Sequence, residues 1–131
     1  MIFDIDNTLV SHDMPHPTPE ISNFLKNFSK NGIKIALVSN NSKARVETFS
    51  RDLHMFYLPR AYKPFKRGLK RVMRELQAVP EETALAGDQL FTDIWGGNRM
   101  GFYTILVTPI KENETWFVAL KRRFEKIFLK N

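Results

Sequence analysis

Short apolar runs alternate with helical patterns five times along this chain, and this alternation constrains its fold more than any other feature. Parallel neighbouring strands need long crossover connections, and a helix between two strands provides one. The alternation therefore predicts an α/β fold: a single Rossmann-like domain over residues 1–131, with a central parallel sheet of about five strands flanked by helices. The order of the strands does not follow from the pattern.

Local signals set the boundaries of the predicted elements. Thr18 is a suitable N-cap with Pro19 at the first helical position, and Lys63-Pro64 is predicted to open another helix. The predicted strands cover residues 1–5, 33–38, 55–58, 83–86 and 102–107. The predicted helices cover residues 19–30, 43–53, 63–78, a short segment after Asp88 that ends at Gly96-Gly97 or Gly101, and residues 113–129.

The composition narrows the choice of partners and compartment. The net charge of +6 favours an anionic partner, whether phosphate, nucleic acid or acidic lipid. The chain has no cysteine, which excludes disulfides and thiolate metal sites. Asp4 and Asp6 interrupt the first apolar run, so it is not a signal peptide, and no apolar run approaches the roughly 20 residues that span a bilayer. We therefore expect a cytoplasmic protein, either soluble or peripheral at the inner face of the membrane.

Polar side chains gather where the predicted strands end. They are Asp4, Asp6, Ser39, Lys63 and Asp88, and Asp93 follows at the start of the next helix. The carboxyl ends of the strands form the ligand-binding edge of an open α/β sheet, so these side chains are expected to lie together. The alternative interpretation is a set of independent capping residues on solvated turns.

This mixture of side chains is typical of phosphoryl transfer, which needs a nucleophile, a proton donor, a divalent cation and fixed positive charge. Asp4 is the predicted nucleophile, which would form an aspartyl-phosphate, and Asp6 is the predicted general acid and base. Mg²⁺ prefers hard oxygen ligands, for which Asp4, the backbone carbonyl of Asp6, and Asp88 are candidates. The predicted phosphate-binding residues, which follow the second and third strands, are Ser39, Asn40 and Lys63.

Together these motifs resemble those of the phosphatases of the haloacid dehalogenase superfamily, in the same order and over nearly the whole chain. The motifs are Asp4-Ile5-Asp6-Asn7-Thr8, Ser39 after an apolar strand, Lys63-Pro64, and Gly87-Asp88 with Asp93. The blocks Gly87–Asp93, Gly96–Arg99 and Thr104–Val107 are similar to the YqeG-type group of subfamily IIIA, which is similar to mitochondrial phosphatidylglycerophosphate phosphatases. The resemblance implies the roles given above and assigns Asp93 to supporting the metal or Lys63 through water.

The spacing of the motifs bears on the substrate. Members of this superfamily commonly carry a cap domain after the first motif or between the second and third, and neither interval here has room for one. The resemblance therefore implies a capless enzyme whose open site reaches a phosphate on a large or membrane-borne substrate such as phosphatidylglycerophosphate. A phosphatase of a soluble small molecule is the alternative, and a homo-oligomer could close the site over such a substrate.

Two basic segments bear on the partner. One predicted helical face carries Lys63, Lys66, Arg67, Lys70, Arg71 and Arg74. This face is either simply solvated or binds a polyanion such as an anionic membrane. The amphipathic helix predicted at residues 113–129 either covers the sheet or lies in a membrane interface. DNA is not expected as a partner, and an RNA- or ribosome-associated basic module is the alternative outside the enzymes.

Overall fold

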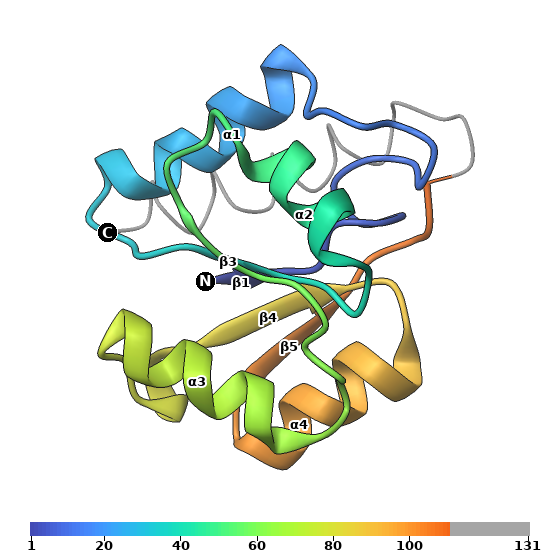
Figure 1. Cartoon of the computed structure of the whole chain (residues 1–131). Coiled ribbons are helices and arrows are strands. Elements are labelled where there is room, and N and C mark those ends of the chain that lie inside the picture. The colour runs from blue at the N-terminus through green and yellow to red at the C-terminus, as the bar shows by residue number, and fades with distance from the viewer. Residues whose placement is uncertain (111–131) are drawn as a thin grey trace.

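A five-stranded parallel sheet lies between two layers of helices in the computed structural model, which describes residues 1–110 (Figure 1). The strand order is β3-β2-β1-β4-β5. The strands are β1 (Ile2–Phe3), β2 (Ala36–Val38), β3 (Phe56–Leu58), β4 (Ala84–Gly87) and β5 (Tyr103–Leu106). The helices are α1 (Pro19–Lys30), α2 (Lys43–Ser50), α3 (Lys66–Leu76) and α4 (Gly96–Met100), with a 3₁₀ helix η1 (Pro80–Glu82) and a π-helical turn η2 (Leu90–Trp95).

The central strands are buried on both faces and alternate between two apolar clusters. In β1, Ile2 belongs to the cluster under α3, whereas Phe3 points to the side of α1 and α2. The Phe3 ring meets Phe24 and Phe28 of α1 edge-on, with ring centroids 5.8 and 5.6 Å apart. Burial on both faces explains why β1, β2 and β4 are nearly continuous apolar runs. The predicted fold class is confirmed.

The first strand is shorter than predicted. β1 ends at Phe3 rather than at residue 5, because the chain turns back on itself at once. The N–H groups of Thr8 and Leu9 both donate to the carbonyl of Ile5, at 3.2 and 3.0 Å. Asn7 adopts the left-handed conformation with φ 58°, which asparagine tolerates better than most residues. This turn carries the first motif out of the sheet and over its carboxyl edge.

Helix α1 begins as predicted, whereas α3 does not. The Thr18 hydroxyl accepts a hydrogen bond from the Ile21 N–H at 3.2 Å, which confirms the predicted N-cap. Lys63-Pro64 does not open α3, which begins at Lys66. A residue before proline is disfavoured in the helical conformation, so Lys63 stays in the preceding loop. Because Lys63 lies outside the helix and is buried, it is not part of the basic face of α3.

The other strands and α-helices of residues 1–110 match their predicted segments, with differences confined to their ends, whereas η1 lies outside every predicted segment. The helix after β4 ends at Gly101, the later of the two predicted stops, where φ of +80° favours glycine. Within this part of the chain, no helix combines the length and apolar character needed to span a bilayer. The amphipathic helix predicted at residues 113–129 lies outside the described residues.

Candidate active site

The carboxyl edge of the sheet brings the predicted site residues together, and all of them except Asp88 and Asp93 line one open cavity of about 400 Å³. Two loops meet there with the first motif: the loop from β2 into α2 and the loop from β3 into α3. The remaining part of the lining comes from Gln89 and Thr92 at the start of η2. The cavity is lined by Asp4, Asp6, Asn7, His12, Ser39, Asn40, Asn41, Lys63, Gln89 and Thr92.

Lys63 is buried at the centre of this site. Its ammonium group donates to Asp4 Oδ1 at 3.0 Å, to Asp93 Oδ1 at 2.6 Å and to the Val38 carbonyl at 3.0 Å, which uses all three of its hydrogens. Burial alone would lower the pKa of Lys63, but the carboxylates of Asp4 and Asp93 outweigh it and raise that pKa. Lys63 is therefore a fixed positive charge in the site.

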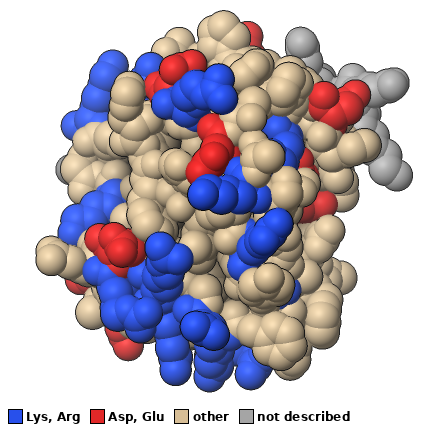
Figure 2. Space-filling view, in the orientation of Figure 1, with Lys and Arg blue, Asp and Glu red and all other residues tan. Residues whose placement is uncertain are grey.

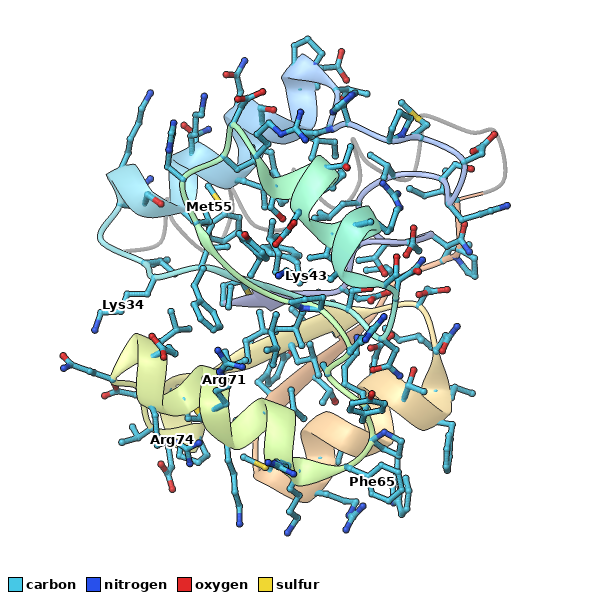
Figure 3. The ribbon with its side chains drawn as sticks, viewed as in Figure 1. Lys34, Lys43, Met55, Phe65, Arg71 and Arg74 are labelled. Atoms are coloured by element: carbon cyan, nitrogen blue, oxygen red, sulfur yellow. The ribbon has the colours of Figure 1, made fainter. Side chains whose placement is uncertain are left out.

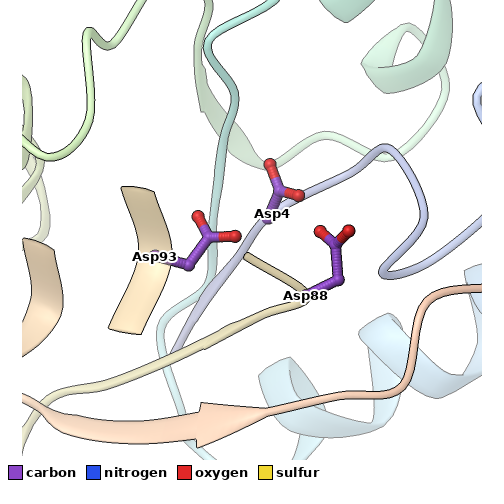
Figure 4. Close-up of side chains that lie close together, drawn as sticks. All are labelled: Asp4, Asp88 and Asp93. Atoms are coloured by element: carbon purple, nitrogen blue, oxygen red, sulfur yellow. The ribbon is translucent and has the colours of Figure 1, made fainter. Parts of the chain in front are cut away.

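Three carboxylates converge beside this ammonium group. One carboxylate oxygen from each of Asp4, Asp88 and Asp93 lies within 4.8 Å of the others, and the side chains point toward one another (Figure 4). The hydroxyl of Thr8 lies 3.3 Å from Asp4 Oδ2 and 3.2 Å from Asp88 Oδ1 and can donate to either. The pKa of Asp4 is raised from 3.8 to about 7, and burial is the largest cause. The Lys63 ammonium acts in the opposite direction and lowers this pKa, whereas the charges of Asp93 and Asp88 raise it further.

The carboxylate cluster is suited to a divalent cation. Three carboxylates against one ammonium leave a formal excess of two negative charges, which a divalent ion would balance. The donors are all hard oxygens, which favour magnesium-like ions over transition metals. Asp93 already binds Lys63 through Oδ1 and the Gln89 N–H through Oδ2, so Asp4 and Asp88 are the carboxylates better placed to hold an ion.

Asp6 lies in the same cavity but has different partners. Its Oδ1 accepts from Arg45 Nε at 3.2 Å and Nη2 at 2.9 Å, and its Oδ2 accepts from the Asn41 side chain at 3.1 Å. Arg45, which belongs to α2, also donates to the carbonyl of Pro15 at 3.2 Å. It therefore connects α2 both to the first motif, through Asp6, and to the loop that follows that motif. The Asp6 carboxylate is thus held apart from the carboxylate cluster, in an orientation fixed by Arg45.

Ser39 and Asn40 occupy the turn between β2 and α2. Ser39 is buried, and its hydroxyl accepts from the Asn41 N–H at 3.0 Å, which leaves its own hydrogen available in the cavity. The Asn40 side chain accepts from the Lys63 N–H at 2.7 Å and donates to the Lys63 carbonyl at 2.9 Å. Asn40 therefore fixes the backbone at Lys63, a structural contact that the sequence did not reveal; phosphate binding by Asn40 stays a prediction.

Several residues complete the site through contacts that the sequence does not predict. Arg45 resembled any other charged residue of a surface helix, and no local signal marks its contact with Asp6. Thr8 was part of the first motif, but its position between two carboxylates depends on the turn after β1. Gly87 has a steric role, because a β-carbon there would collide with the carboxylate of Asp93.

The fold and this site define the class of protein. The family model for haloacid dehalogenase-like hydrolases matches residues 11–101, and the chain belongs to this family. The matched range begins after Asp4 and Asp6, whose place in the site rests on the geometry above. Over 129 residues the chain is 37% identical to "Probable phosphatase YqeG" of Bacillus subtilis (strain 168), covering 98% of this chain and 75% of that protein. The predicted family and the predicted enzyme class, a phosphatase of the haloacid dehalogenase type, are confirmed.

Further similarities are weaker. The chain is 28% identical over 143 residues to phosphatidylglycerophosphate phosphatase 1, chloroplastic/mitochondrial, of Arabidopsis thaliana, and spans 40% of that protein's length. Among solved structures, it is similar to a hydrolase of this superfamily from Ehrlichia chaffeensis (TM-score 0.68, 18% identity, 86% of this chain and 59% of that one). It is also similar to an uncharacterized protein from Listeria monocytogenes serotype 4b (TM-score 0.66, 19% identity, 86% and 82%). At these identities the two structures show a shared fold.

Proposed function

We propose that the chain is a Mg²⁺-dependent phosphomonoester hydrolase that works through an aspartyl-phosphate on Asp4. The observation that carries the proposal is the buried Asp4 carboxylate, set between the Lys63 ammonium and the carboxylate of Asp88 at the wall of an open cavity. A nucleophilic carboxylate for phosphoryl transfer needs fixed positive charge beside it and room for a tetrahedral group in front of it. Asp4 has both.

The first step would form the intermediate. An oxygen of Asp4 attacks phosphorus, the bond from phosphorus to the ester oxygen breaks, and Asp6 in its protonated form gives its proton to the leaving alkoxide. The hydroxyl of Ser39 would donate to an oxygen of the transferring group, and the fixed positive charge of Lys63 would stabilise the negative charge that develops on those oxygens. Because Arg45 and Asn41 hold the Asp6 carboxylate apart from the cluster of Asp4, Asp88 and Asp93, Asp6 would act as a separate proton donor and not as a second nucleophile.

The second step would release phosphate. Asp6, now a carboxylate, takes a proton from water as that water attacks phosphorus, and the bond between phosphorus and Asp4 breaks. A divalent ion held by Asp4, Asp88 and the backbone carbonyl of Asp6 would supply charge neutralisation and Lewis acidity toward the phosphoryl group. Asp93 would keep the Lys63 ammonium in place through their 2.6 Å contact.

We further propose that the substrate's phosphate is carried by a membrane lipid, such as phosphatidylglycerophosphate. The interval between Asp6 and Ser39 holds a loop, α1 and β2, and the interval between Ser39 and Lys63 holds α2 and β3. Neither contains a cap domain, so the cavity is open to a phosphate on a surface. The similarity to the Arabidopsis phosphatidylglycerophosphate phosphatase supports this choice of lipid.

The test is phosphate release from phosphatidylglycerophosphate, from sugar phosphates and from nucleotides, each with Mg²⁺ and with a chelator. We expect release from the lipid that requires the cation and is absent in Asp4→Asn. Activity that is confined to soluble phosphomonoesters would support the phosphatase activity but contradict the proposal of a lipid substrate. Phosphate release by the Asp4→Asn variant would contradict the assignment of Asp4 as the nucleophile.

A further inference from the structure

An exposed apolar surface lies directly beside the catalytic cavity. Nine large hydrophobic side chains are exposed among the described residues, and five of them come from the two segments that flank the cavity. We call these five the aromatic rim: Tyr62, Phe65, Leu90, Phe91 and Trp95. Four of them, Tyr62, Phe65, Leu90 and Phe91, are about two thirds exposed, at 67%, 67%, 67% and 64%. Apolar side chains gathered at this exposure mark interaction sites more often than accidents of packing.

The two segments of the rim form one continuous surface. Pro64 touches α4, because a β-carbon on Gly96 would lie 3.1 Å from the Pro64 α-carbon. In η2 the Phe91 ring stacks on Trp95, with centroids 5.2 Å apart. The Arg99 guanidinium lies 4.8 Å from the centroid of the Trp95 ring, where a cation–π contact holds it beside the aromatic surface.

The rim is also joined to the catalytic residues by the chain itself. Tyr62 directly precedes Lys63, and Leu90 and Phe91 lie between Gln89 and Thr92, which both line the cavity. A surface that covers the rim would therefore lie at the mouth of the active site.

Basic side chains continue this surface along α3. Lys and Arg gather over this helix in the space-filling view (Figure 2). Phe65 lies at the beginning of α3 beside α4, and the exposed Arg71 and Arg74 lie farther along the same helix (Figure 3). The basic flank consists of Lys66, Arg67, Lys70, Arg71 and Arg74, of which the last four are exposed.

We propose that the aromatic rim and the basic flank together are a docking surface for an anionic lipid bilayer. Aromatic and aliphatic side chains would enter the headgroup region, and lysine and arginine would lie over the anionic headgroups. The opposite charge of an acidic lipid surface is the reason for choosing a bilayer over an apolar protein groove. Docking would bring the open cavity to the height of the headgroup phosphates. The proposal rests on the proposed function only in taking the substrate's phosphate to be carried by that bilayer.

The experiment measures co-sedimentation of the full chain with vesicles of phosphatidylcholine and phosphatidylglycerol in equal parts, and with phosphatidylcholine alone. We expect binding to the anionic vesicles, and a loss of about tenfold or more in Phe65→Ser/Phe91→Ser, since each side chain loses most of its apolar transfer energy. Arg67→Gln/Lys70→Gln should lose roughly fivefold per charge at low salt. The matched control is Val79→Ser, an exposed apolar residue in the loop between α3 and η1, outside the rim.

Trp95 provides a second measurement. The chain has two tryptophans, so Trp116→Phe leaves Trp95 as the reporter. Its emission should shift to the blue with anionic vesicles and stay unchanged with phosphatidylcholine alone. An unchanged Trp95 spectrum with bound protein would overturn the assignment of the rim to the bilayer.

Hydrolysis of p-nitrophenyl phosphate keeps the two proposals apart. The rim and flank variants should hydrolyse it at the wild-type rate, which shows that they fold, and Asp4→Asn should bind vesicles like the wild type. If the wild-type protein bound vesicles but hydrolysed no phosphomonoester, the proposed phosphatase function would be wrong and the proposed docking surface would be supported. Wild-type binding by Phe65→Ser/Phe91→Ser, dimerisation through the rim in place of vesicle binding, or retention by RNA alone would each overturn the docking surface.

Discussion

Lys63→Met would remove the ammonium group that the site places between Asp4 and Asp93, while keeping a side chain of similar length. Both carboxylates are buried, and Asp93, whose side chain is 1% exposed, could not recover the lost contact from water without opening the site. We therefore expect a loss of stability as well as a loss of activity, because the substitution leaves uncompensated negative charge inside the protein.

The distances set the size of the effect. Unit charges 2.6 and 3.0 Å apart attract by roughly 5–6 kcal/mol each at an effective dielectric constant of about 20, before the desolvation of Lys63 offsets much of that. Removing one partner of a buried pair costs about 3–5 kcal/mol. We expect Lys63→Met to lower the free energy of unfolding by about 3 kcal/mol, at the low end of this range. The reason is that Asp4, whose pKa is already raised to about 7, can take up a proton when its partner is lost.

Urea unfolding at neutral pH with a chelator present measures this free energy. The loss of unfolding free energy in the double variant Lys63→Met/Asp93→Asn should be smaller than the sum of the losses in the two single variants, by at least about 1 kcal/mol. The reason is that Asp93→Asn removes a negative charge that Lys63→Met leaves without a partner. Lys70→Met, on the exposed face of α3, is the control and should stay within about 0.5 kcal/mol of the wild type. A Lys63→Met protein as stable as the control, with no coupling to residue 93, would refute the reasoning.

Two more predictions concern the carboxylates of Asp6 and Asp4. Arg45→Gln should lower kcat for a soluble phosphomonoester by roughly tenfold to a hundredfold, because Asp6 loses its orientation, whereas Lys43→Gln on the same helix should leave kcat unchanged; equal kcat in both variants would contradict a positioning role. The folded-state pKa of Asp4 is raised, so without metal its contribution to stability is fully present below pH 3.8 and is lost as the pH rises through about 7. Unfolding free energies measured from acid to neutral pH should show this decline, and Mg²⁺ should reduce it; the same pH dependence in Asp4→Asn would argue against this assignment.

The sequence was sufficient to predict the fold class and most of the residues that gather in the candidate site. Helix periodicity and capping signals are local, so Thr18 could be recognised as an N-cap from its neighbours alone. The predicted site residues meet because each follows a strand of one parallel sheet, which is a consequence of topology and not of detailed packing. That is why Asp4, Lys63 and Asp88 could be brought together without coordinates.

What could not be predicted depends on contacts across the fold. The strand order places β1 at the centre, a result of long-range pairing that the alternation of elements does not encode. Arg45 reaches Asp6 from another element, and the Asn40 side chain holds the backbone of Lys63. The start of α3 at Lys66 differs from the predicted start at Lys63, because the Asn40 side chain holds the backbone of Lys63 in the loop.

The central claim is that Asp4 carries the phosphoryl group. The most direct measurement is to mix Asp6→Asn with p-nitrophenyl phosphate and Mg²⁺, quench in acid, reduce with borohydride, and map the peptides by mass spectrometry. The good leaving group needs no proton from residue 6, whereas attack by water does, so the intermediate should accumulate. We predict homoserine at position 4, the product of reducing an aspartyl-phosphate. Homoserine at another aspartate, or phosphate release with residue 4 unmodified throughout, would contradict the mechanism.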